Sequence, residues 1–370
     1  MRDFKKFTIK NVCKAFGAKQ ALNNFNLTLE KGEFITFLGP SGCGKSTALN
    51  CVSGLLPITS GEMFIDDECI DDGVHSMPPE KREFGMVFQN YALFPHLTVF
   101  DNIAFGLVIK KLDKQKIRER VKNTLKMVHL EGYEEKFPGQ MSGGEQQRVA
   151  IARCIVMEPR LLMLDEPLSN LDAKLRIDMR YEIKSIHERL QISSIYVTHD
   201  QQEALALSDR IVVMRLGNIQ QIGTPEEVYS QPSNLFVADF MGFRNIWDAA
   251  IEEMTESDSA IELKLNVQGA RFVSRVTGAA VQQKRATLAE AFKNKQTIST
   301  AIRPEDIILG DGPNQQECQV DVVEYLGQTS QVAASFDNGV RIDLRPEGRV
   351  KHGETIRMAV APEKILFFTK

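Results

Sequence analysis

The stretch GPSGCGKST at residues 39–47 carries the most specific chemistry in the sequence. It follows the apolar run FITFL and precedes ALNCVSGLL, so it joins an expected strand to an expected helix. Its glycines let backbone N–H groups turn toward phosphate oxygens, Lys45 supplies a mobile positive charge, and Ser46 offers a hydroxyl to Mg²⁺. The expected nucleotide contacts are Gly39, Pro40, Ser41, Gly42, Cys43, Gly44, Lys45, Ser46 and Thr47. Kinases, GTPases, recombinases and transport ATPases all carry such a loop, which therefore does not decide among them.

Two adjacent acids form a second chemical feature. The run RLLMLDEP ends its apolar residues at Asp165 and Glu166. In open α/β sheets, ligands gather at the carboxyl ends of the strands. We therefore expect Asp165 to hold Mg²⁺ and Glu166 to accept a proton from an attacking water. The alternative is a pair of solvated acids that cap the next element.

Cys43 lies inside the phosphate loop. The positive potential expected there could lower the pKa of its thiol, and we state as a hypothesis that alkylation at this position blocks ATP binding. The alternative is a small filler side chain at a variable position.

A second anion seat is indicated by Ser142-Gly143-Gly144-Glu145. Ser142 and Glu145 have the spacing of a capping box, and the simple alternative is that Ser142 only caps a helix. The two glycines lower helix propensity, and we interpret them as bare amides at the positive end of a helix. Since the chain has one phosphate loop, this seat is expected to receive a nucleotide held by another copy.

The elements that must position these residues alternate between strands and helices. Short apolar runs predict strands at residues 34–38, 84–88, 161–164, 194–198 and 210–214. Apolar residues spaced by three or four predict helices at residues 115–130 and 173–190. The alternation predicts a doubly wound, mostly parallel α/β sheet, the fold class of P-loop NTPases.

The sequence pattern changes near residue 240 from alternating strands and helices to short β runs. We therefore place a domain boundary between residues 1–240 and 241–370. The second part consists of short β runs separated by turn residues, which predict an all-β barrel or sandwich. The segment 281–295 is an exception and is predicted to be helical.

Composition sets the broad class of protein. The 370 residues carry a net charge of −4, and 43% are hydrophobic, which is typical of globular proteins. The start MRDFKKFTIK is not a secretory signal, and no run is long enough for a membrane-spanning helix. The six cysteines contain no C-x-x-C pair, which favours reduced thiols over a disulfide or zinc framework.

The ordered motifs resemble those of ATP-binding subunits of ABC transporters across essentially the whole chain. They are GPSGCGKST, Gln89 in VFQN, MSGGEQQR, LLMLDEP, SNLD and the TH pair at 198–199. MSGGEQQR resembles the signature motif that separates this family from kinases, GTPases and recombinases, although Met141 and Glu145 depart from the commoner LSGGQ. The resemblance implies an ABC nucleotide-binding domain with a helical subdomain at about residues 90–158.

The resemblance also implies roles for single residues. Gln89 would link Mg²⁺ and water to the docking site for a membrane subunit, Asp172 would cross a dimer interface, and His199 would contact the γ-phosphate. Phe16, where the family more often has Tyr or Trp, would stack on adenine. The alternatives are an exposed loop amide for Gln89, a helix cap for Asp172 and core packing for Phe16. The implied catalytic residues are Glu166, His199, Lys45 and Gln89. The implied metal ligands are Ser46, Gln89 and Asp165. The additional nucleotide contacts are Phe16, Gln89, Ser142, Gly143, Gly144, Glu145, Asp172 and His199.

Residues 241–370 resemble the β-rich, TOBE-like regulatory domain of importer ATPases, with AIRPEDI at 301–307 as a marker. The resemblance implies an ATPase motor that uses ATP and Mg²⁺ and forms a head-to-tail dimer with a second copy. Two membrane permease subunits would dock near residues 89–107, and an extracytoplasmic solute-binding protein would act indirectly. The expected location is peripheral, on the cytoplasmic face of the inner or plasma membrane, without a nucleic-acid partner.

The solute is indicated only by the branch of the family. FMGFRN is closer to the polyamine, ferric iron and phosphonate branch than to the sugar branch. The alternatives are a sugar-type importer ATPase and a soluble ABC ATPase that acts on DNA or ribosomes.

Overall fold

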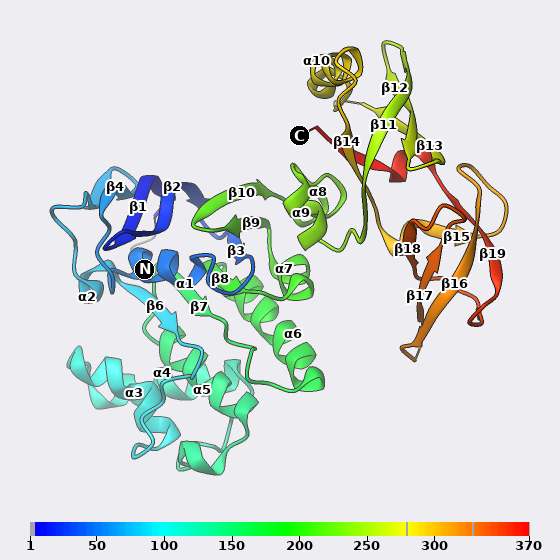
Figure 1. Cartoon of the computed structure of the whole chain (residues 1–370). Helices are drawn as coiled ribbons and strands as arrows, with labels where there is room; N and C mark the ends of the chain where they lie inside the picture. Colours follow the sequence, from blue (N-terminus) through cyan, green and yellow to red (C-terminus); the bar gives the residue numbers. More distant parts are fainter. Residues whose placement is uncertain (1–3, 279, 328, 370) are drawn as a thin grey trace. The chain divides into compact units, whose positions relative to one another are not determined.

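The structure is a computed structural model that describes residues 4–278, 280–327 and 329–369. The chain divides into two compact units, Met1–Gln231 and Pro232–Lys370 (Figure 1). Each unit has its own hydrophobic core, and each is described separately below.

A six-stranded sheet forms the centre of the first unit. Five of its strands are parallel, and the edge strand β10 runs antiparallel to β9. The order is β10 (Asn218–Gly223), β9 (Arg210–Arg215), β3 (Phe34–Leu38), β8 (Ser193–Thr198), β7 (Leu161–Asp165) and β6 (Phe84–Val87). All five residues of β3 are buried, as expected for a strand covered on both faces. The five predicted strands are confirmed, with bounds shifted by at most one residue.

A second, antiparallel sheet of the first unit was not predicted from the sequence. Its order is β2 (Lys19–Glu30), β1 (Lys6–Phe16), β4 (Ser60–Ile65) and β5 (Glu68–Asp71). Its strands mix buried and exposed positions, and register shifts interrupt the β1–β2 pairing. A strand with shifted register does not show a clean period of two in its sequence.

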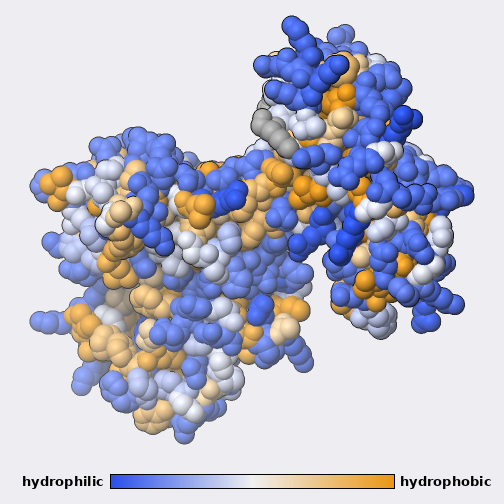
Figure 2. All heavy atoms as spheres, viewed as in Figure 1, coloured by the Kyte–Doolittle hydropathy of each residue, from blue (hydrophilic) through white to orange (hydrophobic). Residues whose placement is uncertain are grey.

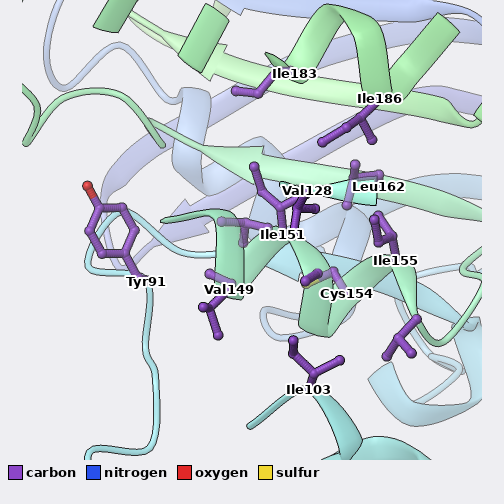
Figure 3. Close-up of a cluster of buried hydrophobic side chains, with 14 of the residues drawn as sticks. Tyr91, Ile103, Val128, Val149, Ile151, Cys154, Ile155, Leu162, Ile183 and Ile186 are labelled. Atoms are coloured by element: carbon purple, nitrogen blue, oxygen red, sulfur yellow. The ribbon is translucent and has the colours of Figure 1, made fainter. Parts of the chain in front are cut away.

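Helices complete the first unit. They are α1 (Lys45–Ser53), α2 (Pro79–Arg82), α3 (Val99–Ile109), α4 (Lys114–Met127), α5 (Gly143–Ile155), α6 (Ala173–Leu190), α7 (Gln201–Leu207) and α8 (Pro225–Ser230), with a 3₁₀ turn η1 (Pro138–Gln140). Ile103 of α3, Ile151 and Cys154 of α5, Leu162 of β7 and Ile186 of α6 belong to one buried cluster (Figure 3). This cluster fixes α5 to the central sheet, and with it the segment that begins at Ser142.

The second unit contains two five-stranded antiparallel sheets, which confirms the predicted all-β class. The first sheet has the order β13 (Ala270–Thr277), β12 (Ala260–Val267), β11 (Asn245–Glu256), β14 (Ile298–Ile302) and β20 (Leu366–Phe368). The second has the order β15 (Ile307–Leu309), β19 (Thr355–Val360), β16 (Gln316–Tyr325), β17 (Ser330–Ser335) and β18 (Arg341–Leu344). The unit begins with α9 (Leu235–Phe240) and includes the predicted helix as α10 (Ala280–Lys293), together with the 3₁₀ turns η2 (Pro304–Asp306) and η3 (Pro362–Lys364).

The surface is mixed in hydropathy. Hydrophilic atoms cover most of the face in Figure 2, and hydrophobic atoms form small separate groups. Within the described ranges, no helix has both the length and the apolar character needed to cross a membrane.

Candidate functional site

The phosphate loop lies between β3 and α1, where the sequence places it. Gly42 has φ of 77° and Gly44, the N-cap of α1, has φ of 109°, a region that favours glycine. A Cβ added at Gly44 would lie 2.6 Å from the Ala21 carbonyl oxygen. Both the backbone conformation and the lack of space therefore require glycine at position 44.

Lys45 is held over the loop rather than in solvent. Its Nζ donates hydrogen bonds to the carbonyl oxygens of Gly39, at 2.8 Å, and Pro40, at 3.1 Å, and the residue is only 4% exposed. The charge is therefore already positioned at the mouth of a loop whose amides suit an anion.

The predicted reactive thiol at Cys43 is wrong in its direction. Cys43 is buried, and this burial raises the pKa of its thiol above the ordinary value, although the nearby Lys45 charge opposes the shift. Desolvation of the thiolate outweighs the positive potential of the loop. The structure thus favours the filler interpretation for the Cys43 side chain.

Four polar side chains from three elements meet at the carboxyl edge of the central strands. Ser46 Oγ donates to Asp165 Oδ1 at 2.8 Å, and His199 Nδ1 lies 3.2 Å from Glu166 Oε2. The Glu166 backbone has a left-handed φ of 42°, and its N–H donates to the Val197 carbonyl at 3.0 Å. A strained backbone held in this way keeps the carboxylate beside His199 instead of along the strand direction.

The Ser46–Asp165 pair has the chemistry of a magnesium site. Burial raises the pKa of Asp165, whereas the hydrogen bond from Ser46 and the charge of Lys45 lower it. A hydroxyl and one carboxylate are hard oxygen ligands, and Mg²⁺ commonly takes its remaining ligands from water and substrate phosphates. Within the described residues there is no group of three or more His, Cys, Asp or Glu side chains that could hold a metal by itself. The pair therefore fits a metal that arrives with a nucleotide.

A pocket of about 400 Å³ lies over the phosphate loop. Among its lining residues are eight that the sequence analysis proposed: Phe16, Ser41, Gly42, Gly44, Lys45, Ser46, Thr47 and Glu166. Phe16 is 51% exposed, so the alternative of core packing is wrong for this ring. The Nζ of Lys14 lies over the ring, 5.1 Å from its centroid, and the ring lines the pocket.

Five lining residues were missed from the sequence: Lys19, Gln20, Ala21, Leu216 and Gly217. They come from the β1–β2 and β9–β10 regions, far apart in the sequence. Leu216 is 75% exposed and lies in a left-handed turn with φ of 47°, two features that are visible only in the structure. An apolar residue kept in a strained turn beside a pocket suits contact with a ligand.

Gln89 lies beside the loop that follows Glu166. Its Nε2 donates to Ser169 Oγ at 3.2 Å, and Asn170 Nδ2 donates to the Gln89 carbonyl at 2.9 Å. Among the described residues, Gln89 forms no hydrogen bond with the side chain of Ser46 or with that of Asp165. Asp172 caps α6 by accepting from the Leu175 N–H at 3.0 Å. Gln89 is thus anchored to Ser169 and Asn170, and Asp172 is anchored to the first turn of α6.

The predicted capping box at the start of α5 is present. Glu145 Oε2 accepts from the Ser142 N–H at 2.7 Å, and Ser142 Oγ accepts from the Glu145 N–H at 3.4 Å. Tyr133 donates its hydroxyl to Glu145 Oε1 at 2.7 Å. The hydrogen bond from the Ser142 amide is the main cause that lowers the pKa of Glu145.

Gly144 also packs closely against α6, which is a second reason for a small residue besides the predicted anion seat. A Cβ added there would lie 2.8 Å from Leu175 Cδ1, so a larger residue would require the Leu175 side chain of α6 to shift. At Gly143 the nearest atom would be Leu171 Cδ2 at 3.2 Å. Residues 142–145 are not among those that line the phosphate-loop pocket of the described chain.

A buried carboxylate that the sequence analysis missed supports the segment around His199. Glu203 Oε2 accepts from Thr198 Oγ1 at 2.7 Å and from Tyr196 OH at 2.8 Å. Thr198 Oγ1 in turn accepts from the Asp200 N–H at 3.0 Å. The residues on both sides of His199 are therefore fixed. The acid was not singled out because nothing in the sequence distinguishes it from a solvated residue of α7.

Comparisons with known proteins identify the families to which both units are similar. A model of the ABC transporter family matches residues 22–169, and a TOBE domain model matches residues 300–368. The spermidine/putrescine import ATP-binding protein PotA of Clostridium novyi (strain NT) is 46% identical over 303 residues, which are 82% of this chain and 80% of the relative. The protein of the same name from Haemophilus ducreyi is 41% identical over 335 residues, which are 90% of this chain and 85% of the relative.

A solved structure is similar to the first part of the chain. It is the dimeric structure of a post-hydrolysis state of the ATP-binding cassette MJ0796 bound to ADP and Pi. It is 33% identical, with a TM-score of 0.52, and the match covers 59% of this chain and 98% of that chain.

Proposed function

The chain belongs to the ABC transporter family as an import-type ATP-binding subunit with a C-terminal TOBE domain, and from this premise we propose that it powers the uptake of a polyamine. Nucleotide binding and ATP hydrolysis coupled to import are properties of the family. The solute is inferred from relatives that are named for spermidine and putrescine import. That similarity covers most of both chains and favours the polyamine branch over ferric iron, phosphonate and sugar importers.

The observation that carries the proposed catalytic role is the convergence of Lys45, Ser46, Asp165, Glu166 and His199 on one edge of the sheet. Lys45 and the glycine-loop amides would bind the phosphates of ATP, and Ser46 with Asp165 would hold Mg²⁺. The metal, when bound, would neutralise charge on the phosphates.

Glu166 and His199 are proposed to act on the attacking water. Glu166 would accept a proton at Oε2, and His199 would orient that carboxylate and reach the γ-phosphate. The separation of 3.2 Å between them supports a shared position beside the phosphate loop. Phe16 would stack on the adenine, since its ring is exposed at the pocket edge. Gln89 would report the state of this site to a membrane subunit.

A second copy of the chain is proposed to complete the site. Ser142, Gly143 and Gly144 lie outside the pocket lining of their own chain, while the first amides of a helix have no intrahelical acceptor. A head-to-tail dimer would bring these amides to the nucleotide of the partner. The dimeric, ADP-bound and Pi-bound form of the related cassette MJ0796 supports this arrangement.

The membrane subunits are proposed to dock near residues 89–107, at the cytoplasmic face of the membrane. Phe94 and Phe105 support this position, because their ring centroids lie 4.6 Å apart and Phe105 is 40% exposed. Arg153 of α5 donates to the carbonyls of Tyr91 and Ala92, at 3.0 and 2.7 Å. A displacement of this segment would therefore pull on the helix that starts at Ser142.

The test is the variant Glu166→Gln, with Glu62→Gln on an exposed strand position as its control. Glu166→Gln should bind ATP, lose at least about a hundredfold in turnover, and form a dimer in gel filtration when Mg²⁺ and ATP are added. Glu62→Gln should hydrolyse ATP like the unmodified protein. A Glu166→Gln protein that hydrolyses ATP normally and stays monomeric would contradict both the catalytic role and the dimer.

A further inference from the structure

The corner between α3 and α4 concentrates positive charge in a chain whose net charge is −4. Residues 110–126 carry eight basic and two acidic side chains, hence a net charge of +6. Seven of the basic side chains are exposed: Lys110, Lys111, Lys114, Lys116, Arg118, Lys122 and Lys126. In the part of the chain that the structure describes, only the eighth, Arg120, has an ion pair, with Glu158 at 3.6 Å.

Most of the charge along α4 does not stabilise the helix, although Lys126 lies in the last turn, where a positive charge is favourable. Lys114, Arg118, Lys122 and Lys126 follow one another at intervals of four residues. Like charges at this spacing repel and destabilise a helix. Asp113 offers no relief along this row, because its carboxylate caps the helix by accepting from the Gln115 N–H at 2.8 Å. An external anionic partner would turn this internal repulsion into binding energy.

Two exposed apolar side chains sit next to this charge. Val108 and Ile109, in the last turn of α3, are 58% and 65% exposed. They are followed directly by Lys110 and Lys111, and α3 and α4 are neighbours in Figure 1. We define the corner patch as Val108, Ile109, Lys110, Lys111, Lys114 and Arg118.

We propose that the corner patch binds the anionic lipid surface of the membrane. The lysines and arginine would contact lipid phosphates, and Val108 with Ile109 would enter the boundary between headgroups and acyl chains. The docking region at 89–107 ends where this patch begins, so lipid contact would orient the subunit beside its permease. The inference rests on the proposed function only for the presence of a membrane partner.

The choice of a lipid surface over a protein or nucleic acid follows from the side-chain types. Six of the eight basic residues in 110–126 are lysines. Protein interfaces are depleted in lysine and enriched in arginine, whose planar fork suits fixed carboxylates. A bilayer surface offers charge without fixed geometry, which suits lysine. Exposed Val and Ile have no use against a phosphate backbone, whereas an interfacial site uses them.

The experiment measures binding of the purified full chain to vesicles of phosphatidylglycerol and phosphatidylcholine in equal parts, and to pure phosphatidylcholine. The test variant replaces Lys110, Lys111, Lys114 and Arg118 by Gln. The control variant replaces Lys81, Lys293, Lys295 and Lys351 by Gln. These lysines are exposed outside the corner patch, and their replacement changes the net charge by the same amount as in the test variant. Circular dichroism and basal ATPase activity of all variants should match the unmodified protein, so a loss of binding would not reflect misfolding.

We expect binding to the anionic vesicles that weakens with salt, and little binding to pure phosphatidylcholine. Each neutralised residue should cost about fivefold in affinity, so the test variant should lose at least about a hundredfold and the control variant much less. A second variant, Val108→Ser with Ile109→Ser, should lose about tenfold toward vesicles and keep any binding to a duplex DNA oligomer.

Three results would overturn the proposal. One is equal affinity of the unmodified protein for both vesicle types. Another is an equal loss in the control variant, which would reduce the effect to net charge. The third is duplex DNA binding as tight as vesicle binding and unaffected by the Val108 and Ile109 changes, which would indicate a general polyanion site. ATPase activity is measured separately, so failure of vesicle binding leaves the proposed motor function intact, and absent ATPase activity leaves the vesicle result intact.

Discussion

Arg82, at the end of α2, offers a sharp test of how the phosphate-loop helix is held. The side chain is fully buried and makes an ion pair with Asp71, which is 1% exposed, at 2.9 Å. Its NH1 group donates to the carbonyls of Cys51 and Val52 in the last turn of α1, at 3.0 and 2.8 Å. The last carbonyls of a helix lack intrahelical donors. The Gly54 N–H donates to the Cys51 carbonyl at 3.1 Å, and Arg82 adds donors to the carbonyls of both Cys51 and Val52.

The variant Arg82→Met removes this donor set but keeps much of the volume. It leaves the buried Asp71 carboxylate with Ser76 Oγ at 2.7 Å and the Gly73 N–H at 3.2 Å as hydrogen-bond donors. Breaking a buried ion pair from one side costs about 3–5 kcal/mol in free energy of unfolding. The double variant Arg82→Met with Asp71→Leu removes the unpaired charge, so it should recover a large part of that loss. Arg357→Met is the matched control, because Arg357 pairs with Asp311 and Glu317 on the surface, where solvent screens the pairs and their loss should have little effect on stability.

The assay is urea unfolding followed by far-ultraviolet circular dichroism, with hydrogen exchange of peptides from α1. Fluorescence of the single tryptophan, Trp247, would report on the second unit instead. Arg82→Met should shift the transition and speed exchange in α1. A loss of stability no larger than that of the Arg357 control would refute the account of Arg82 as the clamp of α1.

The remaining predictions concern nucleotide affinity, thiol reactivity and pH. Phe16→Ala should weaken ATP binding by about 1–3 kcal/mol in calorimetry, Phe16→Trp should not, and Phe292→Ala should have no effect, because stacking needs a ring at the pocket edge. A thiol reagent at neutral pH should modify the exposed Cys69 before the buried Cys43, because burial raises the pKa of Cys43; mass spectrometry that finds Cys43 modified first would contradict this. The pKa of Glu145 is lowered below 4.5, so its carboxylate adds stability above that pH, which is lost as the pH falls through the lowered folded value. The difference in unfolding free energy between the unmodified protein and Glu145→Gln should therefore shrink in acid, and a difference that grows in acid would refute the sign.

The fold could be predicted where one physical signal dominates. Strands β3, β7 and β8 are buried on nearly every residue, so continuous apolar runs reveal them. Strand β1 escaped because its burial pattern breaks where Ile9 and Val12 fall out of register with β2. The pocket residues of β2 and of the β9–β10 turn were also missed. Tertiary pairing, rather than local sequence, brings Ala21 and Gly217 to the phosphate loop.

The candidate site shows a second limit of prediction from the sequence. The same residue type can be required by a ligand or by packing, and the sequence does not distinguish the two. Gly44 was identified correctly, because the motif and the left-handed backbone agree. Gly144 was interpreted through its ligand alone, although the close Leu175 side chain also favours a small residue there. The hypothesis of a reactive thiol at Cys43 rested on the positive potential of the loop, whereas burial raises its pKa and cannot be read from neighbouring letters.

Glu145 bears on whether the start of α5 can receive an anion at all. A free carboxylate there would repel a phosphate, and its lowered pKa keeps it charged. Its oxygens accept from the Ser142 amide at 2.7 Å, the Ser142 hydroxyl at 2.9 Å and the Tyr133 hydroxyl at 2.7 Å. Three donors thus compensate the charge, and the carboxylate consumes the amide of Ser142 but not those of Gly143 and Gly144. Those two amides remain at the positive end of the helix, which is the arrangement that a phosphate held by a second copy requires.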